Sequence, residues 1–139
     1  FGITSDIWSV TSANELYREA KDIERWNHLH PDKKAKVPYI TEVLSKSKGP
    51  FVVSTDYVKL YSDQLRSFIP GDCMVLGTDG FGRSDLRSQL RSHFEVDRFH
   101  VAYYAIKALY DQGHLKLDVV KQAMKKYKIK VNKPNPLHA

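Results

Sequence analysis

Apolar residues follow two different spacings along this chain. Short apolar runs occur at residues 7–10, 51–53 and 73–76. After each run, apolar residues recur at steps of three or four, which is the spacing of an amphipathic helix. A strand followed by a helix, three times over, is typical of α/β proteins with parallel strands. The pattern therefore predicts one α/β domain over residues 1–139, in which the three runs are strands.

Polar residues ahead of the helical stretches predict where each helix begins. Ser12, with Glu15 three residues later, has the spacing of a capping box for a helix that reaches Trp26. Asp56 and Ser84 are expected to cap the helices after the second and third strands, because their side-chain oxygens accept from free backbone N–H groups. The expected apolar faces are Leu16, Ala20 and Ile23; Val58, Tyr61, Leu65 and Phe68; and Leu86, Leu90 and Phe94.

Three more helices are expected outside this repeat. Pro38 stands at the first position of a short one, and a long amphipathic helix follows Asp97 and closes at Gly113. Asp118 is expected to cap the last helix. In the short helix Ile40, Val43 and Leu44 are expected to be buried; in the last, Val119, Val120, Ala123 and Met124 face inward and Lys121, Lys125 and Lys126 outward.

The turn after the third strand contains three glycines, Gly77, Gly80 and Gly82. A strand, a glycine turn and a helix start bring backbone N–H groups together, as in many anion sites of α/β proteins. The spacing matches neither the dinucleotide fingerprint nor a Walker loop. A turn that needs residues at positive φ explains the glycines equally. The spacing alone leaves both readings open.

Composition describes an ordinary soluble domain, with 42% hydrophobic and 27% charged residues. No apolar run approaches the roughly 20 residues of a membrane helix, so no membrane contact is expected. The chain starts at Phe1 without an initiator Met or a signal sequence, which predicts that it begins inside a longer protein. The net charge of +6 is C-terminal: residues 1–97 hold 13 Lys/Arg and 14 Asp/Glu, and residues 98–139 hold 9 and 2.

Several candidate chemistries are disfavoured by their surroundings. The lysine-rich segment lacks interleaved aromatic residues, so a solvated face is expected rather than a nucleic-acid site. His28 and His30 lie two apart in a polar loop without Cys or carboxylate partners at ligand spacing, so no metal site is expected. Cys73 stands alone in an apolar run, which predicts a buried, unreactive thiol.

The residues of the glycine turn also form a longer motif, Gly77-Thr-Asp-Gly-Phe-Gly-Arg-Ser-Asp85, followed by Leu90-Arg-Ser-His-Phe-Glu-Val-Asp97. This motif resembles the C-terminal domain of the homodimeric bacterial pyruvate dehydrogenase E1 family. Further matches lie in the same order over nearly the whole chain: Ser5–Ser12, Glu24–Asn27, Leu29–Pro31, Val37–Ile40, Ser54–Tyr57 and Asn135–Ala139.

The resemblance implies a fold and a partner enzyme. The family is cytoplasmic and uses thiamine diphosphate and Mg²⁺ to decarboxylate pyruvate and reductively acetylate the lipoyl group of E2, the dihydrolipoyl acetyltransferase. Its C-terminal domain is a three-layer α/β/α sandwich of the transketolase C-terminal type with about five strands. Three are expected here, the chain being truncated at its N-terminus, and one missing strand would run between residues 7–10 and 51–53.

The resemblance carries no catalytic, cofactor-binding or metal-binding residue onto this chain, whose counterpart in the family helps to hold the homodimer. We therefore expect the isolated chain to be inactive, to bind no cofactor by itself and to be marginally folded. The best contact candidates are Asp79, Phe81, Arg83 and Asp85, although Phe81 folding back onto the core is as compatible with the sequence. The alternatives are a stand-alone anion- or nucleotide-binding module using the Gly77–Gly82 turn, and a basic protein-interaction domain.

Overall fold

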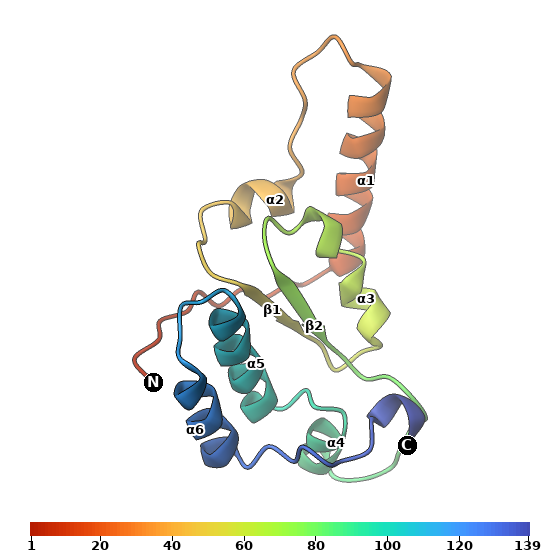
Figure 1. The fold of residues 1–139 in the computed structure, drawn as a ribbon. Coiled ribbons are helices and arrows are strands. Elements are labelled where there is room, and N and C mark those ends of the chain that lie inside the picture. The colour runs from red at the N-terminus through yellow and green to blue at the C-terminus, as the bar shows by residue number, and fades with distance from the viewer.

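A computed structural model describes residues 1–139, and Figure 1 shows two strands with helices on either side of them. Two one-turn 3-10 helices are labelled η. In chain order the elements are α1 Ala13–Leu29, α2 Tyr39–Leu44, β1 Phe51–Ser54, α3 Lys59–Asp63, η1 Arg66–Phe68, β2 Cys73–Leu76, α4 Arg87–His93, α5 Arg98–Asp111, α6 Leu117–Tyr127 and η2 Pro136–His138.

The two strands form a parallel pair in which Phe51 lies opposite Cys73 and Ser54 opposite Leu76. Side chains alternate between the faces of a strand. Phe51, Val53 and Cys73 pack against one helical cluster, whose buried members come from α1, α2 and the segment around η1. The opposite face is covered by α5, which contacts both strands. The α/β fold with parallel strands is therefore confirmed.

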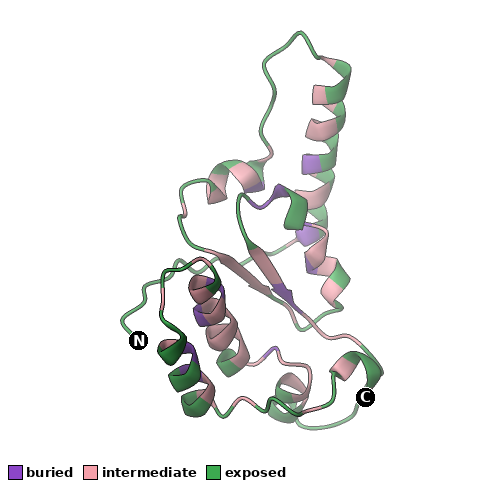
Figure 2. Ribbon diagram, viewed as in Figure 1, coloured by how far each residue is buried: buried purple, intermediate pink, exposed green.

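Most of the buried apolar residues belong to two separate clusters. The larger joins Ala13, Ala20, Ile40, Leu65, Phe68 and Ile69, and the smaller joins Ile106 of α5 to Val120 and Ala123 of α6. In all, 14 of 139 residues are buried, a small core for a chain of this length, and Figure 2 shows buried positions only as isolated patches. Large apolar side chains consequently remain on the surface.

Helix α1 projects beyond the rest of the molecule, and the segment 30–38 runs back from its far end (Figure 1). The Asn27 side chain bonds the backbone of Lys36 twice, at 2.9 and 2.8 Å. The Lys36 ammonium lies 4.0 Å from the centre of the Trp26 ring. These contacts hold the returning segment against the last turn of α1.

The prediction of a strand at residues 7–10 is wrong. Residues 1–11 make no backbone–backbone hydrogen bond, and Ile7 and Trp8 are 91% and 56% exposed. A strand exists only when a neighbour accepts and donates its backbone hydrogen bonds, and none lies beside this segment. The sheet therefore has two strands where three were expected.

Three of the predicted caps are also wrong. Val58 rather than Asp56 precedes α3, Leu86 rather than Ser84 precedes α4, and neither preceding residue caps its helix with its side chain. The last helix begins at Leu117, so Asp118 lies inside its first turn. Similarly, Pro38 precedes α2 instead of opening it, the expected single helix after Asp56 divides into α3 and η1, and Leu86 is 72% exposed.

Other local predictions are confirmed. The Ser12 hydroxyl accepts from the Glu15 N–H at 3.3 Å. The helix expected after Asp97 is α5, and the Asp97 carboxylate, for which no cap was predicted, accepts from the Phe99 and His100 N–H groups. The lysines of α6 are exposed on its outer side. None of the helices combines the length and the apolar content needed to cross a bilayer.

Candidate functional site

The glycine turn lies between β2 and α4 and is fixed at its first residues by the start of α3. A side chain at Gly77 would place its Cβ 2.5 Å from the Lys59 Cα, so only glycine fits there. The Asp79 carboxylate accepts from the Lys59 N–H at 3.1 Å. The Thr78 N–H donates to the Tyr57 carbonyl at 2.9 Å. The Asp79 carboxylate therefore makes its hydrogen bond within the domain.

The middle of the turn is covered by the C-terminal segment. Gly80 has φ +95°, and a Cβ at this position would lie 2.1 Å from the Pro136 carbonyl oxygen. The covering segment is itself anchored, because the Lys133 ammonium bonds the Ser92 carbonyl at 2.9 Å, the His93 carbonyl, and the Glu95 carboxylate at 3.3 Å. Lys133 thereby supplies a hydrogen-bond donor to the free carbonyl groups at the end of α4.

Phe81 projects from the tip of this covered turn and is 78% exposed. Of the two placements considered from the sequence, the structure has the outward one. A phenylalanine exposed to this degree between two glycines has no role in the core. Its surroundings, residues 79–85, are otherwise polar.

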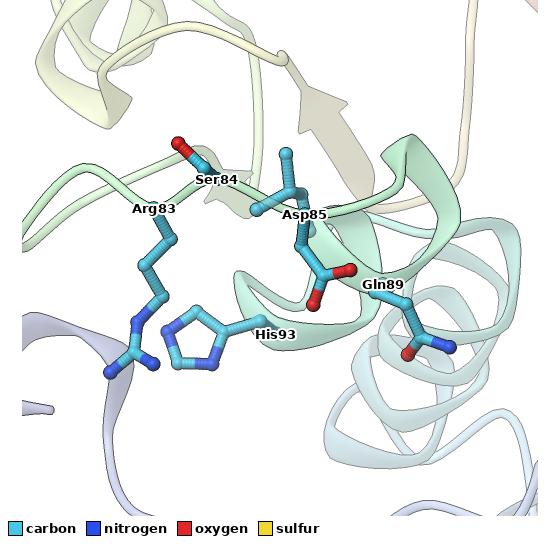
Figure 3. A pocket seen from close by; sticks show the side chains of 6 residues that line it. Arg83, Ser84, Asp85, Gln89 and His93 are labelled. Atoms are coloured by element: carbon cyan, nitrogen blue, oxygen red, sulfur yellow. The ribbon is translucent and has the colours of Figure 1, made fainter.

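Beyond Phe81, residues 83–85 and α4 enclose a cleft of about 260 Å³ (Figure 3). Asp85 is oriented by the Leu86 N–H, which donates to its carboxylate at 2.7 Å. Figure 3 shows the Arg83 side chain extending alongside the His93 ring. The cleft is lined by Arg83, Ser84, Asp85, Gln89, Leu90 and His93.

His93 lines the floor of this cleft, and its environment is unusual. Its Nε2 atom is buried and has no hydrogen-bond partner. Desolvation lowers the pKa of His93, and the positive charges of Arg83 and Lys133 lower it further. The imidazole is therefore neutral at neutral pH, so one ring nitrogen can donate and the other can accept.

An ion pair fixes α4 relative to the sheet. The Arg91 guanidinium donates twice to the Asp56 carboxylate, at 3.1 and 2.5 Å, and Arg87 lies 3.5 Å from the same group. The Arg91 hydrogen bond lowers the pKa of Asp56. Asp56, expected to start a helix, instead holds the α4 wall of the cleft in place.

The remaining candidate residues do not join this cleft. Cys73 is half-buried in β2, and burial raises the pKa of its thiol, in keeping with the expected low reactivity. The His30 Nδ1 lies 2.8 Å from the Trp26 carbonyl and its ring stacks on the Trp26 ring. A second, shallower hollow runs along α1 and is lined by Glu15, Arg18, Glu19, Asp22, Ile23, Trp26 and Lys36.

Sequence reasoning selected Arg83 and Asp85 but missed His93 as their neighbour. One signal was available, because positions 86, 90 and 93 lie on adjacent turns of a helix that begins beside the glycine turn. Lys133 and Pro136 carried no such signal. Their contacts to this region span about forty residues or more of chain.

Comparison with known proteins gives a consistent result. Residues 1–97 match the family described as transketolase-like TK C-terminal domain. The chain is 51% identical to the pyruvate dehydrogenase E1 component of Pseudomonas aeruginosa over 138 residues, which are 99% of this chain and 16% of that protein. It is 47% identical to the protein of that name in Cupriavidus necator (99% and 15%) and 48% identical to that in Escherichia coli K12 (98% and 15%). The chain thus spans about one sixth of the length of these relatives.

Proposed function

The chain belongs to the family of transketolase-like TK C-terminal domains, and on that premise we propose that it is the C-terminal part of a pyruvate dehydrogenase E1 component. The observation that carries this proposal is 47–51% identity to E1 components over 98–99% of the chain. Identity at this level over nearly the whole chain supports the same fold and the same place in the subunit.

The activity proposed for the complete subunit is decarboxylation of pyruvate and reductive acetylation of the lipoyl group of E2. Thiamine diphosphate and Mg²⁺ supply that chemistry in the family, in the cytoplasm of bacteria. The residues of this chain do not fit the metal ion, because no three His, Cys, Asp or Glu side chains gather at metal-ligand distance. We derive no catalytic step from this domain and place the cofactor in other parts of the subunit.

The role proposed for this domain is to support the subunit and its homodimer. Phe81 carries that proposal, because exposed aromatic side chains are the commonest anchors of protein interfaces. Asp79 holds the turn that presents Phe81, and Arg83 and Asp85 follow it directly. The apolar residues of the exposed segment 1–11 are further surface that the rest of the subunit would cover.

The stand-alone nucleotide-binding reading is not favoured. A cleft of about 260 Å³ with one apolar lining residue is too small and too polar for a nucleotide. The relatives that match the chain share the name of an E1 component instead.

The experiment compares three preparations: the complete subunit that carries this chain, the same subunit ending before residue 1, and the isolated chain. Pyruvate-dependent acetylation of a lipoyl domain is measured together with dimer mass by sedimentation. Turnover is expected only in the complete dimer. Full turnover by the shortened subunit would overturn the supporting role, and turnover by the isolated chain would overturn the location of the chemistry.

A further inference from the structure

Arg83 is the cation of the glycine-turn region that no carboxylate neutralises. Its neighbours Arg87 and Arg91 both pair with Asp56, at 3.5 and 2.5 Å. Arg83 has no acidic group within 4.0 Å, although Asp85 stands two residues away. A guanidinium presents a planar fork of donors that fits a carboxylate on two oxygens. The cleft therefore contains an unused donor of this kind.

His93 adds a second unused group. Its buried Nε2 has no partner within the protein, and a buried polar atom in this state is rare in native structures. The ring lies beside the Arg83 side chain (Figure 3). The charged groups that surround it are Arg83 from the turn, Lys133 from the C-terminal segment and Glu95 after α4. Lys133 is paired with Glu95 at 3.3 Å, which leaves Arg83 as the charge that can attract an anion.

The other wall of the cleft limits which anion fits. Asp85 contributes a negative charge, and one of its oxygens is occupied by the Leu86 N–H. A doubly charged phosphate would be repelled more strongly by this carboxylate than a singly charged group. The cavity of about 260 Å³ suits a group of a few heavy atoms. These limits select a carboxylate.

We propose that the cleft between residues 83–85 and α4 is a carboxylate-binding site in which the Arg83 guanidinium donates to the bound group beside the His93 imidazole. The carboxylate can come from a free small acid or from a side chain elsewhere in the E1 subunit. The inference rests on the proposed function only in the second case. In that case the bound carboxylate is part of the subunit contact made next to Phe81.

The test uses the complete subunit carrying this chain, alkylated by bromoacetate or by its neutral analogue bromoacetamide. An imidazole nitrogen attacks the methylene carbon, bromide leaves, and the added mass on His93 is read by peptide mass spectrometry. If the site binds a free acid, the ratio of the bromoacetate rate to the bromoacetamide rate at His93 is expected to be about tenfold higher in the parent protein than in Arg83→Gln. A tenfold change corresponds to about one charge-assisted hydrogen bond. Propionate is expected to slow the reaction.

His114 is the internal control, because it is an exposed imidazole outside the cleft. Its relative rates are expected to be the same in Arg83→Gln and in the unmodified protein. Arg83 is exposed, so its substitution leaves the core intact. Pyruvate turnover, measured in the same preparation, reports separately on the proposed function.

If a side chain of the subunit already fills the site, His93 is expected to resist both reagents in the dimer. Arg83→Gln then raises the dimer dissociation constant about tenfold, and Arg83→Lys restores part of the loss, since it keeps the charge without the fork. Equal rates with the two reagents, together with an unchanged dissociation constant in Arg83→Gln, would overturn the proposal from either source.

Discussion

The carbonyl oxygen of Pro136 blocks the space for a side chain at Gly80, because a Cβ built there would lie only 2.1 Å from that oxygen. Gly80 also has φ +95°, in the region that residues with a side chain rarely adopt. The same glycine is thus required twice, by its own backbone and by the C-terminal segment that covers it.

Gly80→Ala is therefore expected to release this cover. Backbone strain at positive φ costs about 1–2 kcal/mol, and the overlap with Pro136 adds to it. Hydrogen exchange of residues 128–139 in the complete subunit should accelerate. Gly82→Ala is the matched control, because nothing lies within 4 Å of its Cβ position. Equal exchange in the two variants would show that the segment does not depend on Gly80.

Asp97→Ala is expected to destabilise the domain by about 1 kcal/mol, since its carboxylate accepts from two N–H groups at the start of α5 at 2.9 Å each. Chemical denaturation followed by circular dichroism measures the change. Asp118→Ala removes the same carboxylate from the first turn of α6, where it makes no cap, and should cost less. A larger loss in Asp118→Ala would contradict the capping assignment.

The pair between Asp56 and Arg91 should make stability depend on acid. The pKa of Asp56 is held below its ordinary value of 3.8, mainly by the Arg91 hydrogen bond. A depressed carboxyl pKa contributes stability above the ordinary value, and this is lost as the pH falls through the folded-state pKa. Because Asp56 is 53% exposed, the contribution is expected to be about 1 kcal/mol or less.

Asp56→Asn should accordingly lower the midpoint of urea unfolding at pH 7, and its effect should become smaller as the pH falls below the ordinary carboxyl pKa. Asp118→Asn, which removes an exposed acid without an ion pair, serves as the comparison. If both variants show the same dependence on pH, the Asp56 pair has no separate effect.

Phe81→Ala is expected to weaken the E1 homodimer without changing the fold of the domain. Truncating an interface anchor costs about 1–2 kcal/mol or more, so the dissociation constant should rise at least about tenfold. Sedimentation at a series of subunit concentrations measures it. Leu86→Ala is a suitable control, because Leu86 is also on the surface at 72% exposure but outside the turn. Identical dissociation constants for Phe81→Ala and the parent protein would exclude the contact.

Sequence patterns located the elements whose partners are close in the chain. The Ser12 cap is satisfied three residues later, and the Asp97 cap two and three residues later. The strands at residues 51–54 and 73–76 were predicted within one residue, because their apolar runs are short and clearly bounded. The α/β class followed from these elements.

The errors arose where the partner is distant or outside the chain. Asp56 is of a residue type that often caps helices, but Arg91, 35 residues away, binds its carboxylate and removes it from that role. Residues 7–10 have the composition of a strand, yet a strand cannot form without a neighbouring edge. The cleft was not predicted: Arg83 and Asp85 were selected as contact candidates from the turn that precedes α4, while His93 joins them only through the helix.

The cover over the glycine turn also sets an order of events during protein synthesis. Gly80 leaves the ribosome well before Pro136, because α4, α5 and α6 are made between them. Until Pro136 and Lys133 arrive, Gly80 is uncovered and the end of α4 keeps its free carbonyl groups. The surface around Phe81 is therefore completed only after α4, α5 and α6 have been made, so the proposed dimer contact through this surface would form after them.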